Sequence, residues 1–134
     1  MIATTASARE AQYKFQKLEV YQQALEYLDR IYDLTKTFPA EEKYNLTSQL
    51  QRAATSIALN IAEGSTGQSD AEQHRFLGLS LRSYLETVAC LDIALRRRIV
   101  TDHDVEGIGA LGHQLFAKIQ AFRRSLRNQS VSGQ

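Results

Sequence analysis

The sequence predicts an all-α protein, folded as an up-down antiparallel four-helix bundle. Four long segments place apolar residues at the helical spacing of three and four. The 134 residues are 43% hydrophobic, which suits one domain with a buried core, and they include a single Pro and no Trp. Short loops join the segments and favour antiparallel neighbours. We therefore predict a bundle over residues 14–128, between disordered tails at 1–13 and 129–134.

The first predicted helix runs from about residue 15 to 36 and ends before Pro39, since the residue preceding a proline disfavours helix. Its apolar stripe comprises Leu18, Tyr21, Leu25, Leu28 and Tyr32, widened by Val20, Ala24, Tyr27 and Ile31. The stripe covers about half of the circumference, more than one bundle needs. The surplus apolar surface favours self-association into a homo-oligomer.

Helix boundaries follow from capping residues. The second helix is predicted over 41–63, with Gly64 as its C-terminal stop. The third is predicted over 70–97, because Ser69 and Glu72 form a capping box at its start. The fourth begins at Thr101 and carries three internal glycines, for which close helix packing is the expected reason: Gly107, Gly109 and Gly112.

No catalytic, metal or cofactor motif stands out. The three histidines lack an HExxH or ExxH spacing, and no P-loop or nucleophile elbow is present. Cys90 lies among apolar residues and is expected to be a small buried side chain. No apolar run approaches the roughly 20 residues that span a bilayer, and the N-terminus lacks the features of a secretory signal. We expect a cytoplasmic, non-enzymatic protein without cofactor, metal or membrane association.

A row of polar residues follows one side of the second predicted helix at steps of three and four. Its members are Gln49, Arg52, Ser56, Asn60 and Glu63. Short amides and hydroxyls in place of Lys and Glu suit a site where polar atoms meet defined partners rather than water. We expect a structural polar network across the bundle, with Glu86 as a partner for Arg52, while a ligand site is the alternative.

Positive charge gathers late in a chain whose net charge is only +1. Residues 96–134 hold seven Lys/Arg against three Asp/Glu, net +4, whereas residues 1–70 hold seven against nine, net −2. The seven cations are the candidate nucleic-acid-binding residues: Arg96, Arg97, Arg98, Lys118, Arg123, Arg124 and Arg127. Cations at helix C-termini are also favoured by the helix dipole, which is the plainer explanation. Repetition of the patch in an oligomer favours binding of a polyanionic backbone.

Several segments together resemble one family. The central one reads Gln49-x-x-Arg52-Ala53-x-x-Ser56-Ile57-x-x-Asn60-Ile61-Ala62-Glu63-Gly64. Flanking matches are Leu18-x-x-Tyr21-x-x-Ala24, Phe38-Pro39-x-x-Glu42-x-Tyr44-x-Leu46 and Arg82-Ser83-Tyr84-Leu85-Glu86, the last with Arg82 in place of a usual glycine. Over about residues 15–126 the chain resembles the four-helix-bundle proteins encoded in intervening sequences of bacterial large-subunit ribosomal RNA.

The resemblance implies a homopentameric ring of four-helix bundles. That family includes the accessory variability protein of diversity-generating retroelements, which binds a reverse transcriptase and structured RNA without catalysing a reaction. The expected partners are therefore other copies of the chain, an RNA or DNA backbone and a reverse transcriptase. The alternative is a bundle that acts only through protein–protein contacts, without nucleic acid.

Overall fold

The computed structural model describes residues 10–67 and 69–132, with side chains as far as Leu126. In this part of the chain, four long α-helices follow two 3-10 turns. The helices are α2 (Glu19–Thr35), α3 (Leu46–Gly64), α4 (Asp70–Arg96) and α5 (Asp102–Ser132), and the turns are η1 (Lys14–Lys17) and η2 (Ala40–Glu42). The described residues thus confirm the predicted all-α fold.

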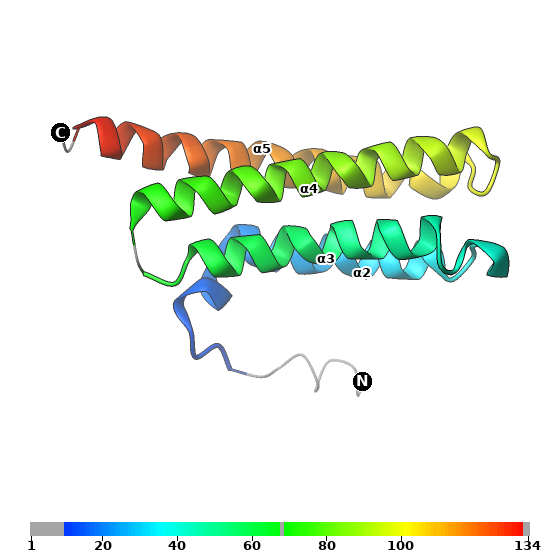
Figure 1. Cartoon of the computed structure of the whole chain (residues 1–134), viewed down its shortest axis with the longest axis horizontal. Helices are drawn as coiled ribbons and strands as arrows, with labels where there is room; N and C mark the ends of the chain where they lie inside the picture. Colours follow the sequence, from blue (N-terminus) through cyan, green and yellow to red (C-terminus); the bar gives the residue numbers. More distant parts are fainter. Residues whose placement is uncertain (1–9, 68, 133–134) are drawn as a thin grey trace.

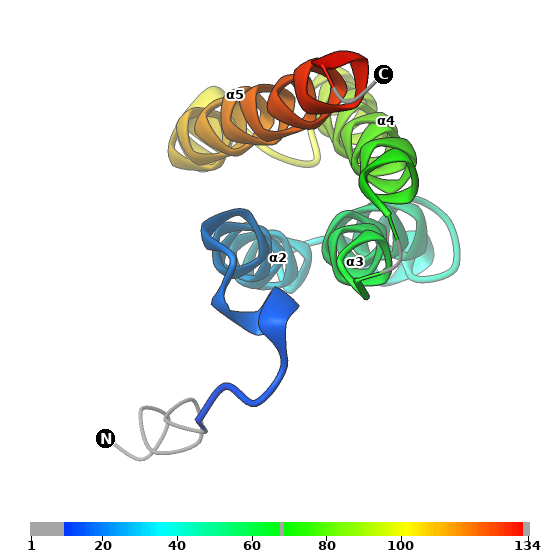
Figure 2. The same ribbon diagram turned by 90° about the vertical axis from the view of Figure 1, so that its left-hand side faces the viewer.

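The helices run up and down in chain order and form two layers (Figure 1). Viewed along the bundle, α2 and α3 lie side by side in one layer, and α5 and α4 cover them in the other (Figure 2). Each helix therefore packs against its neighbour in sequence, and α5 closes the square against α2. None of the described helices is both long and apolar enough to cross a bilayer.

Three predicted helix boundaries differ from the structure. The first helix begins at Glu19 rather than near residue 15, because residues 14–17 form the separate turn η1 and the extended Leu18 divides this turn from α2. The Gln16 side chain closes the turn by accepting the Tyr13 N–H at 2.8 Å. Residues 40–42 form η2, and Asn45, with φ −124° and ψ −102°, delays the start of α3 to Leu46. Helix α5 extends to Ser132, past the expected end at 128. Residues 1–9, 133 and 134 of the predicted tails lie outside the described residues.

The predicted starts of α4 and α5 are confirmed, although of the predicted α4 capping box the described residues show only the bond that Ser69 accepts. Ser69 Oγ accepts the Glu72 N–H at 3.0 Å and begins α4. At the start of α5, Asp104 Oδ2 accepts the Thr101 N–H at 2.8 Å and Thr101 Oγ1 accepts the Asp104 N–H at 3.2 Å. The bonds from Thr101 also lower the pKa of the Asp104 carboxyl. Reciprocal bonds of this kind satisfy backbone N–H groups that a helix start leaves open.

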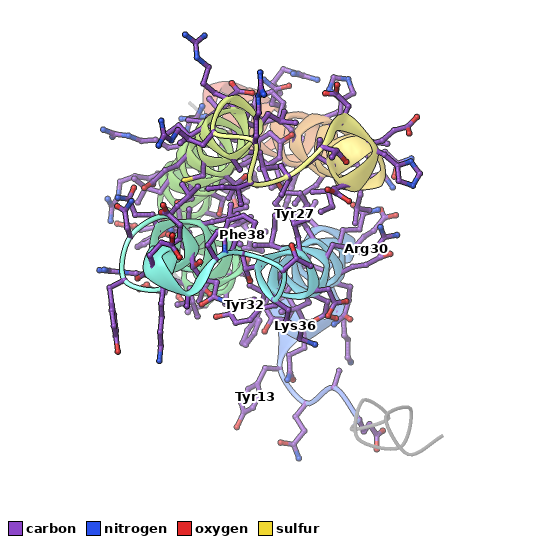
Figure 3. The ribbon with its side chains drawn as sticks, turned by 90° about the vertical axis from the view of Figure 1, so that its right-hand side faces the viewer. Tyr13, Tyr27, Arg30, Tyr32, Lys36 and Phe38 are labelled. Atoms are coloured by element: carbon purple, nitrogen blue, oxygen red, sulfur yellow. The ribbon has the colours of Figure 1, made fainter. Side chains whose placement is uncertain are left out.

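On α2, the residues that widen the predicted stripe are the true core. Val20, Ala24, Tyr27 and Ile31 are buried, whereas Tyr32 is 42% exposed. Figure 3 shows Tyr27 directed between the two layers and Tyr32 directed away from them. The other four members of the predicted stripe are only partly buried: Leu18, Tyr21, Leu25 and Leu28.

A buried polar group joins α2 to α4 in the centre of the bundle. Thr87 Oγ1 donates to the Tyr84 carbonyl (2.6 Å) and so accepts the hydrogen bond from Tyr27 Oη (2.8 Å). The centroids of the Tyr27 and Tyr84 rings lie 5.6 Å apart. Burial raises the pKa of both phenols. Gly112 of α5 faces this pair, and a Cβ there would lie 2.8 Å from Tyr84 Cε1.

Close packing therefore explains one of the three glycines of α5. At Gly109 a Cβ would meet no heavy atom within 4 Å, and at Gly107 it would meet only the Arg30 guanidinium at 3.4 Å. The packing explanation is confirmed for Gly112 and is wrong for Gly109. Gly64 is a further close contact, because its Cβ would fall 2.6 Å from Phe76 Cβ where α3 crosses α4.

Candidate nucleic-acid and protein interface

The end of α4 presents three consecutive exposed arginines, Arg96, Arg97 and Arg98. Their backbone closes the helix, since the Ile99 N–H bonds to the Ala94 carbonyl (2.8 Å) and the Arg98 N–H to the Leu95 carbonyl (3.0 Å). This Schellman pattern places its penultimate residue in the left-handed region, and Arg98 has φ 61°. Glycine is the usual residue at such a position, because a Cβ there costs about 1 kcal/mol.

Two of the other candidate cations are engaged inside the protomer. Lys118 Nζ pairs with Glu19 Oε2 at 2.7 Å and ties α5 to α2. Arg123 Nε donates to the His74 carbonyl at 3.0 Å, and its guanidinium lies over Gly78, where a Cβ would come 2.8 Å from Nη2. A larger residue at 78 would displace this guanidinium. Both cations thus contribute to helix packing.

The remaining two candidates differ in what the structure describes. Arg124 is exposed. Arg127 lies on α5, and its side chain is outside the described part of the chain. Because α4 and α5 are antiparallel, these residues and Arg96–Arg98 lie at opposite ends of the pair (Figure 1). The 27 residues of α4 put the two groups about 40 Å apart, as the sequence predicts.

The polar row of α3 lies on the outside of the protomer. Gln49, Arg52 and Glu63 are exposed, and Ser56 and Asn60 are half-buried. Together with Tyr32 of α2 and with Lys43 and Tyr44, which lie between η2 and α3, this side of α3 lines an open groove of about 830 Å³. The groove is lined by Tyr32, Lys43, Tyr44, Thr47, Ser48, Gln51, Arg52, Thr55, Ser56, Leu59, Asn60 and Glu63.

One hydrogen bond of the predicted network crosses between helices. Ser83 Oγ of α4 donates to Ser56 Oγ at 2.9 Å. Asn60 Nδ2 donates to Ser56 O (2.9 Å) and Ser56 Oγ (3.0 Å), within its own helix. Arg52 and Glu86 line a common hollow, but among the described residues they form no ion pair. Within one protomer, most of the row therefore faces solvent.

Replacing Asn60 with leucine should lower the free energy of unfolding by about 0.5–1.5 kcal/mol in the protomer, since both bonds of its amide to Ser56 are removed. Urea denaturation measures the change. Gln49→Leu is the matched control, because Gln49 is exposed on the same helix, and it should change the value by less than about 0.5 kcal/mol. Equal effects of the two changes would contradict a stabilising role for the Asn60 amide.

The described residues hold no group of three or more His, Cys, Asp or Glu side chains able to bind a metal ion. Cys90 is buried, and burial raises the pKa of its thiol. The thiol is therefore kept neutral and away from solvent, as expected for a small core residue.

Ser83 and the conformation of Arg98 are two features of this surface that sequence reasoning missed. Ser83 stands out in the sequence only as part of a motif, and no local pattern pairs it with Ser56, which lies 27 residues earlier. The left-handed φ of Arg98 could not be predicted from its residue type, because glycine and asparagine are the residues that usually adopt this conformation at the end of a helix.

Comparison with known proteins agrees with the four-helix fold. One solved structure, a protein of unknown function from the S23 ribosomal protein family of Bacteroides thetaiotaomicron, is 28% identical. It superposes with a TM-score of 0.71 over 78% of this chain and 97% of its own. No curated protein matches the chain. The model of the family described as 23S rRNA-intervening sequence protein matches residues 16–121. The four-helix chain therefore belongs to the 23S rRNA-intervening sequence protein family.

Proposed function

We propose that the protein is a non-catalytic scaffold that assembles from several copies of the chain, as a pentameric ring, and binds structured RNA. In this proposal it serves a reverse transcriptase as an accessory protein of a diversity-generating retroelement. The likeness of residues 49–64 to the family motif supports the assembly, and the exposed arginines support the RNA contact.

Arg98 is the observation that carries the RNA proposal. Its left-handed backbone favours glycine by about 1 kcal/mol, and its side chain is exposed. In the described part of the chain, no hydrogen bond or ion pair of its guanidinium offsets that cost. A locally unfavourable residue suggests a requirement outside the fold, and a phosphate contact is what arginine supplies best.

Assembly strengthens such a contact. Asp102 and Asp104 begin α5 close in sequence to the arginines, so this end of one protomer is not uniformly positive. One protomer therefore offers only a few phosphate contacts. Copies related by symmetry repeat them on one RNA molecule, and linked weak contacts add up to a much higher affinity.

The test is a titration of structured RNA at several salt concentrations, followed by fluorescence anisotropy. Arg96→Gln/Arg97→Gln/Arg98→Gln should weaken binding and reduce the slope of log K against log salt by roughly one for each phosphate that is no longer neutralised. The matched control removes the same charge elsewhere, as Lys17→Gln/Arg75→Gln/Arg82→Gln, and should keep the native slope. Equal losses of affinity in both variants would contradict a specific arginine site.

Arg98→Gly separates stability from binding. Glycine relieves the left-handed backbone, so the free energy of unfolding should rise by about 1 kcal/mol, as measured with urea. RNA affinity should fall in the same protein because a phosphate ligand is removed. A variant that is more stable and binds RNA as well as the native chain would show that Arg98 makes no contact with it.

The second candidate function is a bundle that acts only through protein–protein contacts. The engagement of Lys118 by Glu19 and of Arg123 by the His74 carbonyl favours it, since these cations are then less available to phosphate. A pull-down from nuclease-treated lysate that recovers a reverse transcriptase, together with no RNA binding at low salt, would select this alternative.

A further inference from the structure

The outward side of α3 is poor in charge for a solvent-facing helix. Eleven of its residues are not buried, and only Arg52 and Glu63 among them are charged. Helix α2 also has eleven such residues, of which five are charged. Depletion of charge, with neutral and aromatic residues in its place, distinguishes the centres of protein interfaces from ordinary surface.

Large side chains at this groove remain uncovered in the protomer. Tyr44 precedes α3 and is 87% exposed, Tyr32 of α2 is directed outward (Figure 3), and Leu59 is exposed in the second half of α3. The groove is also lined by short side chains such as Thr55 and Ser56. Short neutral residues beside exposed rings let another protein surface approach the helix closely.

Among the described residues, Arg52, Glu63 and Glu86 form no ion pair in the protomer. Arg52 and Glu63 are eleven residues apart, which is three helical turns and about 16 Å, too far for them to pair with each other. Glu86 of α4 lines a hollow with Arg52 without forming an ion pair in the described part of the chain. Lys43 also lines the groove, with its ammonium 5.3 Å from the centroid of the Tyr44 ring. The face and the adjoining hollow thus present two cations, Arg52 and Lys43, and two carboxylates, Glu63 and Glu86.

From this arrangement we propose that the outward face of α3 is a contact surface for a second copy of the same chain, in which Arg52 of one copy pairs with Glu63 or Glu86 of the next. A second copy supplies both signs of charge at once. An RNA backbone fits this face less well, because the carboxylates of Glu63 and Glu86 offset the charges of Arg52 and Lys43 and repel phosphate. The inference rests on the proposed assembly and names the surface that forms it.

Light scattering on the purified full chain at micromolar concentration tests the contact. Arg52→Glu should raise the dissociation constant of the oligomer by about 100-fold, as loss of a desolvated charge pair does. Restoring opposite charge, as Arg52→Glu/Glu63→Arg or Arg52→Glu/Glu86→Arg, should recover assembly for whichever carboxylate is the partner. Arg124→Glu, an exposed arginine on α5, is the control and should assemble normally.

Circular dichroism establishes that each variant is folded. The contact is overturned if folded Arg52→Glu assembles like the native chain, or if neither double variant restores assembly. Binding of a different protein to this face, with the native chain remaining a single protomer, also overturns it.

The same samples, titrated with structured RNA, separate this inference from the proposed function. A native oligomer that binds no RNA but dissociates on Arg52→Glu ends the RNA proposal and leaves the α3 contact standing. An oligomer that binds RNA and is indifferent to Arg52→Glu ends only the α3 contact. A native chain that stays a single protomer ends both the contact and the ring.

Discussion

Replacing Gly112 with alanine is expected to lower the free energy of unfolding by about 1–2 kcal/mol. The new Cβ would lie 2.8 Å from Tyr84 Cε1 and 2.9 Å from Tyr27 Cε1, so the rings or α5 must move. The Tyr27 hydroxyl is hydrogen-bonded to Thr87, and the Tyr84 ring packs against Phe116, with centroids 5.2 Å apart. Overpacking of about 1–3 kcal/mol therefore exceeds the gain of up to about 1 kcal/mol in helix propensity.

Gly109→Ala is the matched control, because it makes the same chemical change three residues away in the same helix. A Cβ at Gly109 meets no heavy atom within 4 Å, so only the difference in helix propensity remains. Stability should rise by up to about 1 kcal/mol. Chemical denaturation of both variants gives the comparison, and destabilisation by both would indicate that α5 responds to something other than the tyrosine contact.

Alkaline unfolding should depend strongly on Tyr27. Burial raises the pKa of this phenol in the folded chain, despite the opposing effect of the Thr87 bond, whereas an unfolded tyrosine titrates near about 10. Below pH 10 the phenol is protonated in both states and has no effect on the pH dependence. Above it the unfolded chain loses the proton first, so stability should fall by about 1.4 kcal/mol per pH unit for this group, until the folded pKa is reached.

Tyr27→Phe should remove that slope, although loss of the bond to Thr87 costs about 1 kcal/mol at neutral pH. Thermal melts from pH 9 to 12 measure both effects. Tyr44→Phe, at an exposed ring, is the control and should lose stability with pH as the native chain does. Some pH dependence of stability should remain in Tyr27→Phe, because burial also raises the pKa of Tyr84. An unchanged slope in Tyr27→Phe would contradict the effect of burial.

The all-α fold and the starts of α4 and α5 could be predicted because they depend on local chemistry. Ser69 with Glu72 and Thr101 with Asp104 place their own caps within three residues. The start of α3 could not be predicted in this way. Asn45 adopts a non-helical backbone between η2 and α3, although the surrounding sequence is compatible with one continuous helix.

The candidate site was predictable in part. The polar row from Gln49 to Glu63 is evident from its spacing, but spacing does not say which side of a helix its neighbours cover. Because other faces of α3 pack against α2 and α4, the row faces outward. Among the described residues, one hydrogen bond joins the row to another helix, from Ser83 Oγ to Ser56 Oγ. Likewise, the sequence does not distinguish the seven candidate cations from one another. In the structure Lys118 pairs with Glu19 and Arg123 donates to the His74 carbonyl.

The sequence by itself determined the helix-forming segments, their caps and the family, because apolar period, capping residues and motif residues are properties of short stretches of chain. Only the tertiary structure decided which face of each helix is buried, which of Gly107, Gly109 and Gly112 meets a neighbour, and which arginines remain open to a ligand. These outcomes depend on contacts between residues far apart in the chain. Their distances follow from how the four helices pack, and no local pattern encodes them.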